Sequence, residues 1–214
     1  NGRTLSTNNF GIGTDGQSRI TDSTDGLTAN VTTYAYNNAN NQLLSSETKN
    51  SAGTVISSST RGIGADGLSR TLTQTDKDGN VTTFAYGGNN QVNSSATANR
   101  GGTALSTAIY QPGIDGQSRI HSETDTPTGN VTTYAYNGNN QIETSETRNT
   151  SNVFITTAVY EIGVDGRSRI RGQTDYMTGA PQNVTTLFYD GNNQLSSTET
   201  KNGAGTLVSS ATYE

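Results

Sequence analysis

The sequence predicts an all-β protein built from tandem β-hairpins, and three observations support that prediction. A short segment of alternating small and aromatic residues returns at a nearly constant interval. Asp-Gly or Asn-rich turn signals separate the copies. The composition is only 29% hydrophobic and 14% charged, which leaves a chain rich in Asn, Thr, Ser and Gly with a thin core. We expect hairpins of about 25 residues, paired into units of about 50, in one continuous antiparallel sheet.

The repeated strand reads Val-Thr-Thr followed by an aromatic residue or leucine. Its copies begin at Val31, Val81, Val131 and Val184, and an insertion around residues 177–182 precedes the last one. A fixed period of this size is typical of architectures in which each unit buries its apolar surface on its neighbours. We therefore interpret residues 1–214 as a single array. Its units are approximately 11–60, 61–110, 111–160 and 161–213, and residues 1–10 end a preceding unit.

Both ends of the sequence fall in the same phase of the repeat. The segment 4–10 resembles 103–110, and 206–213 resembles both. Arrays of this kind usually finish in atypical units with a polar outer face, and neither end has that pattern. We expect an excerpt of a longer array, or a unit whose ends are covered by copies of itself.

An Asp-Gly turn followed by an arginine opens every unit. Regular carboxylates could act as the acid and base of a glycosidase, which needs two carboxyl groups with unequal pKa values. A catalytic site is normally unique, however, whereas these residues recur with the turn. The pattern favours turn-capping aspartates and a structural arginine ladder. The pairs are Asp15 and Arg19, Asp66 and Arg70, Asp115 and Arg119, and Asp165 and Arg169.

The repeated strand alternates between two faces, because successive side chains of a strand point to opposite sides. Val131, Thr133 and Ala135 share one face, and Thr132, Tyr134 and Tyr136 share the other. If equivalent strands stack in register, two structural rows follow, and each cross-strand pair would contribute roughly 0.2–1 kcal/mol. One row is Tyr34, Phe84, Tyr134 and Leu187, and the other is Tyr36, Tyr86, Tyr136 and Tyr189.

These motifs resemble the Rhs, or YD, repeat, in which Tyr-Asp-x-x-Gly-Arg-Leu precedes a Gly-Asn-x-Thr-x-Tyr-x-Tyr-Asp strand. Residues 66–70 and 75–86 are close to a full match, and the resemblance covers essentially the whole chain. Tyr189-Asp190 keeps the literal Tyr-Asp pair. The family's Arg is replaced in alternate hairpins by Gln42, Gln91, Gln141 and Gln194.

The resemblance implies a long sheet of hairpins that winds into a spiral. Such sheets form the hollow shells of bacterial Rhs and insecticidal toxin proteins and the barrel of teneurins. It therefore implies a structural role at the cell surface or outside the cell.

Cofactor and metal sites are not predicted. The chain has no cysteine, which excludes disulfides and thiolate metal sites. His121 is the only histidine, so a catalytic triad or a histidine-rich metal site is not available. The segment 76–80 is similar to half of a calcium loop but lacks the distal carboxylate that such a loop needs. A solvated turn is the simpler interpretation.

Charge and hydropathy exclude two classes of partner. The formal net charge is -5 with a pI near 4.8, which gives no basic surface for nucleic acid or anionic membrane. No apolar run approaches the roughly 20 residues that span a bilayer, and no signal segment opens the sequence. If the protein is secreted, we expect its signal upstream.

Asn-Val-Thr sequences begin each repeated strand and are formal glycosylation acceptors in a secretory setting. Since Asn also suits the turn, four acceptors follow automatically once one strand is repeated, and we favour that interpretation. The four are Asn30, Asn80, Asn130 and Asn183, and Asn93 and Asn149 add two more outside the strand.

The sequence thus predicts a non-enzymatic structural segment of a large secreted or cell-surface bacterial protein. It would form an elongated wall or a self-associating filament, with copies of itself or flanking repeats as partners. Uncapped sheet edges with little charge favour self-association. Two alternatives stay open: part of an Rhs-type shell around a toxin, and an adhesive or carbohydrate-binding module that uses exposed Tyr and Asn.

Overall fold

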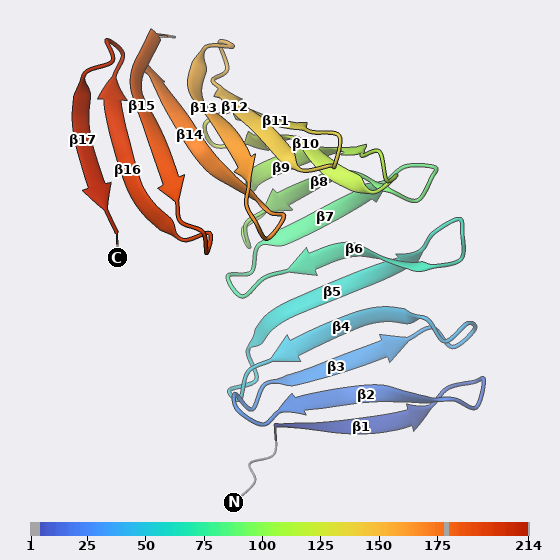
Figure 1. Cartoon of the computed structure of the whole chain (residues 1–214). Coiled ribbons are helices and arrows are strands. Elements are labelled where there is room, and N and C mark those ends of the chain that lie inside the picture. Colours follow the sequence, from blue (N-terminus) through green and yellow to red (C-terminus); the bar gives the residue numbers. More distant parts are fainter. Residues whose placement is uncertain (1–4, 178–179, 214) are drawn as a thin grey trace, which may run out of the picture. The chain divides into compact units, whose positions relative to one another are not determined.

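A computed structural model of the chain describes residues 5–177 and 180–213, and it confirms the all-β prediction (Figure 1). The described residues form β-strands and no helix, so none of them lies in a helix that could cross a membrane. The strands are β1 (Ser6–Ile12), β2 (Ser18–Asp25), β3 (Val31–Tyr36), β4 (Leu43–Lys49), β5 (Val55–Ile63), β6 (Ser69–Thr75), β7 (Val81–Tyr86), β8 (Val92–Ala98), β9 (Ala104–Pro112), β10 (Ser118–Asp125), β11 (Asn130–Tyr136), β12 (Ile142–Arg148), β13 (Phe154–Ile162), β14 (Ser168–Met177), β15 (Ala180–Tyr189), β16 (Leu195–Asn202) and β17 (Leu207–Thr212).

The chain divides into two compact units, Asn1–Leu105 and Ser106–Glu214, and the boundary falls inside β9. In the first unit β1 to β8 pair antiparallel, each strand with the next along the chain. In the second unit β9, from Ser106 onward, pairs with β10, and the same pattern continues to β17. Each unit is therefore a meander of hairpins, as the sequence predicts. Of the insertion expected at 177–182, residues 178 and 179 lie outside the described residues.

A β-bulge recurs at the same place in every repeat. In β10, Ile120 faces Tyr110 and Ser122 faces Ile109, so His121 is the extra residue. Thr21, Leu72 and Arg171 occupy the same position in β2, β6 and β14. A bulge bends its strand and increases the local twist. The bulged position holds a different residue type in each repeat, and it is the position without a direct partner on the paired strand.

The core is as thin as the composition predicts. Among the described residues, the buried apolar side chains are Ala108 and Ala158, at 7% and 9% exposure. In β3 and β7 the aromatic positions are half-buried and the alternate Thr and Ala positions are exposed. Each meander is a single layer with two unequal faces, because no second layer from the same unit covers either face.

The expected direct stacking of the aromatic rows is wrong. Tyr34 and Tyr36 lie on β3, whereas Phe84 and Tyr86 lie on β7, and β4, β5 and β6 run between them. In the second unit three strands likewise separate β11, with Tyr134 and Tyr136, from β15, with Leu187 and Tyr189. Because neighbouring strands are about 4.8 Å apart, side chains separated by three strands do not touch. The two faces themselves alternate as predicted.

Threonine hydroxyl pairs connect strands where aromatic contacts were expected. On the tyrosine-bearing face, the second residue of each Val-Thr-Thr segment meets a threonine of the next strand. The oxygen–oxygen distances are 2.9 Å for Thr32–Thr48, 2.9 Å for Thr82–Thr97, 2.9 Å for Thr132–Thr147 and 3.0 Å for Thr185–Thr200. Threonine suits a strand, and these hydrogen bonds add to its pairing energy.

Candidate functional site

The most distinctive chemistry of the chain lies in the turns along one edge of each unit. Since a meander reverses direction at every turn, alternate turns share an edge. We call this the linked edge. It comprises turns 13–17, 37–42, 64–68 and 87–91 in the first unit, and 113–117, 137–141, 163–167 and 190–194 in the second.

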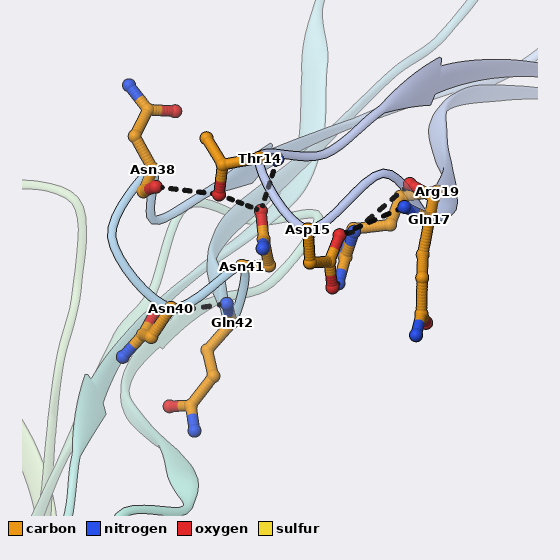
Figure 2. Close-up of polar contacts among 8 residues, drawn as sticks. All are labelled: Thr14, Asp15, Gln17, Arg19, Asn38, Asn40, Asn41 and Gln42. Carbon is orange, nitrogen blue, oxygen red and sulfur yellow. Dashed lines mark hydrogen bonds and ion pairs between the residues drawn. The ribbon is translucent and has the colours of Figure 1, made fainter.

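Each predicted Asp and Arg pair meets inside its turn. Both carboxylate oxygens of Asp15 accept hydrogen bonds from Arg19, at 2.7 and 2.5 Å, and Asp15 Oδ1 also accepts the Gln17 N–H at 3.0 Å (Figure 2). The equivalent ion pairs are Asp66 with Arg70, Asp115 with Arg119 and Asp165 with Arg169. Each aspartate thus contacts the arginine of its own turn, as expected for a turn-capping residue.

The arginines also reach the neighbouring turn, which contains the Asn-Asn sequence. Arg70 Nε donates to the Asn90 carbonyl at 3.0 Å, Arg119 Nε to the Asn140 carbonyl at 3.2 Å, and Arg169 Nη1 to the Asn193 carbonyl at 2.7 Å. A guanidinium has five N–H donors in a fixed fork, so one side chain can hold two turns at once.

An asparagine of that neighbouring turn in turn accepts a hydrogen bond from the backbone of the Asp-Gly turn. Asn41, Asn90, Asn140 and Asn193 all have positive φ, between 57° and 65°, a conformation that Asn tolerates better than most residues. Their Oδ1 atoms accept the backbone N–H of Thr14, Ala65, Ile114 and Val164 at 3.0–3.1 Å. Figure 2 shows the first of these contacts, where the Thr14 hydroxyl also donates to the Asn38 carbonyl at 2.9 Å.

Glutamine continues the links to the following turn. Gln42 Nε2 donates to the Gly67 carbonyl, and Gln141 Nε2 donates to the Gly166 carbonyl at 2.5 Å. The amide of each of these glutamines therefore joins two turns without adding a charge.

The glycine two residues before each aspartate is a further component of the linked edge that was not predicted from the sequence. A Cβ at Gly113 would lie 2.5 Å from Asn140 Oδ1 and 2.6 Å from Arg119 Nη1, and one at Gly13, Gly64 or Gly163 would collide with the arginine of its own turn. Only glycine lets the guanidinium fold over the turn. The signal was present in the sequence, because Gly-x-Asp-Gly recurs in all four units.

The second aromatic row anchors the linked edge through its hydroxyl groups. Tyr36 donates to the Ile20 carbonyl at 2.9 Å, Tyr86 to the Thr71 carbonyl at 2.7 Å, Tyr136 to the Ile120 carbonyl at 2.7 Å and Tyr189 to the Ile170 carbonyl at 2.8 Å. Each acceptor directly precedes the bulged residue of its strand. The tyrosine hydroxyls thus tie the strand that carries them to the irregular backbone of the neighbouring strand.

The electrostatics of the turns hold the carboxylates ionised. Hydrogen bonds from Arg70 and the Leu68 N–H lower the pKa of Asp66 to about 2. The pKa of Asp15 and Asp115 is lowered by the same kind of contact, and that of Asp165 mainly by the Arg167 N–H. All four shifts run opposite to the raised pKa that a general acid requires.

Shallow recesses beside the linked edge repeat along with it. The first lies among Gly13, Arg19, Tyr36 and Asn41, with a volume of about 230 Å³, and equivalents of about 300 and 110 Å³ adjoin Arg70 and Arg119. Many of their polar groups are the ones that bind the turns together. The recess beside Arg119 is also lined by the imidazole of His121.

The other residues considered as candidates make contacts close to them in the sequence or lie on strands. The Asp76 carboxylate accepts hydrogen bonds from the N–H groups of Asp78 and Asn80 and from the Asn80 side chain, all at 2.9 Å, so it caps its own turn. His121 is half-buried at the bulge. Across residues 5–177 and 180–213 there is no cluster of three or more metal-ligating side chains. Asn30 directly precedes β3, Asn130 begins β11 and Asn183 lies inside β15; all three are half-buried, and glycosylation there stays a prediction.

Comparisons with known proteins give distant likenesses. No family model and no curated protein matches the sequence. Similar solved structures include a TcdB2-TccC3-Cdc42 complex (17% identity over 86% of this chain, TM-score 0.40) and the Photorhabdus luminescens Tc holotoxin pore (14% over 92%, TM-score 0.34). The chain spans 12% and 15% of those proteins. A porin-like protein from Bacteroides uniformis is 14% identical over 80% of this chain and 83% of its own, with a TM-score of 0.37.

Replacing Gly113 with alanine tests the close approach of arginine to the turn. We expect Gly113→Ala to lower the free energy of unfolding by about 1–3 kcal/mol, because its Cβ displaces Arg119 and Asn140. Gly138→Ala is the matched control, since its Cβ would meet nothing within 4 Å. Urea denaturation of both variants measures the difference, and equal stabilities would contradict the steric role.

Removing one hydroxyl group tests the contribution of these tyrosine contacts. We expect Tyr136→Phe to cost about 1 kcal/mol, the usual net value of such a hydrogen bond, because the Ile120 carbonyl loses its donor. Tyr213→Phe serves as control, since Tyr213 is 49% exposed at the end of the described chain. Chemical denaturation measures the free energy of unfolding of both variants. An unchanged value for Tyr136→Phe would show that the Tyr136 hydroxyl contributes nothing to stability.

Acid should weaken the linked edge. The folded pKa of the four turn aspartates lies below the ordinary 3.8, so their contribution is complete above pH 3.8 and is lost as the pH falls through the folded value. We expect the thermal unfolding midpoint to be level from pH 7 to about 4 and to fall towards pH 2.

Circular dichroism at a series of pH values measures this dependence. A variant with all four aspartates changed to asparagine should be less stable at pH 7 and show a flatter acid limb. The same slope in both proteins would assign the acid loss to other groups.

Proposed function

We propose that this chain is a structural, non-catalytic repeat segment of a large secreted or cell-surface bacterial protein, where it forms an elongated wall or a self-associating filament. The observation that carries the proposal is the linked edge. Its side chains bind each turn to the next in every repeat, and they do so in place of a hydrophobic core.

The use of the charged residues supports a structural role. The pairs Asp15–Arg19 and Asp115–Arg119 make equivalent contacts in different units. The charged side chains of these turns therefore have the same structural role in each repeat. A catalytic centre instead needs groups whose environments differ from one another. The location outside the cell rests on the resemblance of the repeat to the Rhs family.

A container is the second candidate, and the unequal faces favour it. A wall that encloses something meets different surroundings on its two sides. In β3 the side chains of Tyr34 and Tyr36 are half-buried on one face while Thr33 and Ala35 are exposed on the other.

Electron microscopy of the parent protein tests the structural role. We expect elongated particles or filaments for a wall and hollow particles for a container, because lateral addition of hairpins extends a sheet in one direction. Compact, strictly monomeric particles would contradict the filament. Immunogold labelling of intact bacteria with an antibody to this segment tests surface location, and label found only after lysis would contradict it.

Binding measurements distinguish an adhesive or carbohydrate-binding module from a wall. A glycan array probed with the purified chain should give no specific signal if the segment is a wall. Saturable binding of one glycan class would favour an adhesive or carbohydrate-binding module instead.

A further inference from the structure

Two turns of the second unit contain the dipeptide Asn-Gly, the sequence at which asparagine most readily loses its side-chain amide. Asparagine is a thermolabile residue, and glycine has no side chain to hinder attack of its backbone nitrogen on the asparagine Cγ atom. Within residues 5–177 and 180–213 the dipeptide occurs as Asn137-Gly138 on the linked edge and as Asn202-Gly203 on the opposite edge. The reacting groups are the same, so the two turns around them set the difference in the folded chain.

The two turns have the same internal hydrogen bonds. In each of them the asparagine Oδ1 accepts the N–H groups of the residues two and four positions later, at 2.9 and 3.0 Å for Asn137 and at 3.1 and 2.9 Å for Asn202. In the part of the chain that the structure describes, no hydrogen bond uses the N–H of Gly138 or Gly203. The attacking nitrogen is therefore available at both sites.

Contacts with other turns hold Asn137 in place. Its Nδ2 donates to Gln141 Oε1 at 3.3 Å, and Gln141 Nε2 donates to the Gly166 carbonyl of the following turn at 2.5 Å. Asn140 Oδ1 accepts the Ile114 N–H of the preceding turn at 3.0 Å. Both the amide that would leave and the backbone that would have to rotate are thus restrained by the linked edge.

Asn202 has no such restraint. Among the described residues its Nδ2 makes no hydrogen bond, and the hydrogen bonds of the turn 202–206 stay inside that turn. Gly203 is exposed, and a Cβ there would lie 2.4 Å from the Pro181 carbonyl oxygen. Because only glycine fits so close to that oxygen, the packing itself requires the reactive dipeptide.

We propose that Asn202 is a site of spontaneous deamidation and that the linked edge protects Asn137 from the same reaction. The Gly203 nitrogen gives up its proton and bonds to Asn202 Cγ, the Cγ–Nδ2 bond breaks, and the amide leaves as ammonia with that proton. Water then opens the cyclic imide at either carbonyl, which gives aspartate or isoaspartate. Water is the only co-reactant. The reaction concerns chemical ageing of the chain and goes beyond the proposed structural role.

The aspartate product fits this kind of turn. Asp190 begins a turn with the same hydrogen bonds, and its Oδ1 accepts the N–H groups of Asn192 and Gln194 at 2.8 Å each. Conversion of the neutral amide to a carboxylate adds one negative charge to the formal net charge of -5. Isoaspartate instead adds a carbon to the backbone of the turn, which the Gly205 N–H closes by donating to the Asn202 carbonyl at 2.8 Å.

Peptide mapping of the purified full chain measures both sites in one sample. The protein is incubated in mildly alkaline buffer, and mass spectrometry of its peptides follows the replacement of NH2 by OH at each asparagine over time. We expect Asn202 to react at least about 5-fold faster than Asn137, the change in rate that one typical net hydrogen bond gives. In concentrated urea, where the turns are lost, the two rates should converge.

A pair of glutamine variants tests the source of the protection. Gln141→Ala removes the contact with Asn137 Nδ2 and the link to the next turn, so it should raise the Asn137 rate at least about 5-fold. The Asn202 rate should not change. Gln117→Ala is the matched control, since Gln117 is an exposed residue of the same edge, and it should alter neither rate. Circular dichroism checks that both variants are folded.

Three results would overturn the proposal. They are equal rates at the two sites in the folded chain, a difference that persists unchanged in urea, and a folded Gln141→Ala variant with the wild-type rate at Asn137. The second result would assign the difference to the flanking residues and not to the turns. The microscopy of the parent protein does not depend on these rates, so the structural role stands or falls separately.

Discussion

The structure depends on hydrogen bonds between side chains of one turn and the backbone of the next. A typical hydrogen bond contributes only about 1 kcal/mol net, and no single link between Asn140 and Ile114 or between Gln141 and Gly166 would hold a domain together. In a repeat, however, the same small contribution is added at every interface between neighbours. The linked edge of each unit can therefore substitute for the buried apolar core that a globular domain requires.

The contacts of the linked edge depend on local irregularities of the backbone. The bulge at His121 twists β10, the positive φ of Asn140 turns its side chain towards the neighbouring turn, and the absence of a Cβ at Gly113 lets Arg119 lie over its own turn. Each feature is unfavourable or neutral alone. Together they satisfy backbone groups that would otherwise be unpaired, which explains why all of them recur with the same period.

Much of the fold could be predicted from the sequence, because the evidence for it is local. Turn residues and alternation within the Val-Thr-Thr segment define hairpins, and Asp115 and Arg119 are close enough in sequence to be paired by their spacing. The contacts of Tyr36 and Tyr86 could not be predicted in the same way, because the repeat period says which residues are equivalent but not which strands are neighbours. Equivalent strands lie four positions apart in the meander, so the tyrosines brace bulges of adjacent strands and do not stack on one another.

The contrast between the two edges of each unit separates what the repeat needs from what it tolerates. On the edge opposite the linked one, Asn149 Oδ1 accepts N–H groups of Ser151 and Val153 in its own turn, and Asp125 caps its own turn through the Thr128 N–H. Self-contained turns can change in length and sequence without disturbing a neighbour. The insertion at 177–182 includes the ends of one hairpin, where Tyr176 pairs with Pro181 and Met177 with Ala180. On the linked edge, Gly, Asp and Arg recur with the turns that begin at 13, 64, 113 and 163, while the partner turn 37–42 is one residue longer than 87–91, 137–141 and 190–194. The repeat therefore keeps the residues that link one turn to the next and tolerates changes of length on both edges.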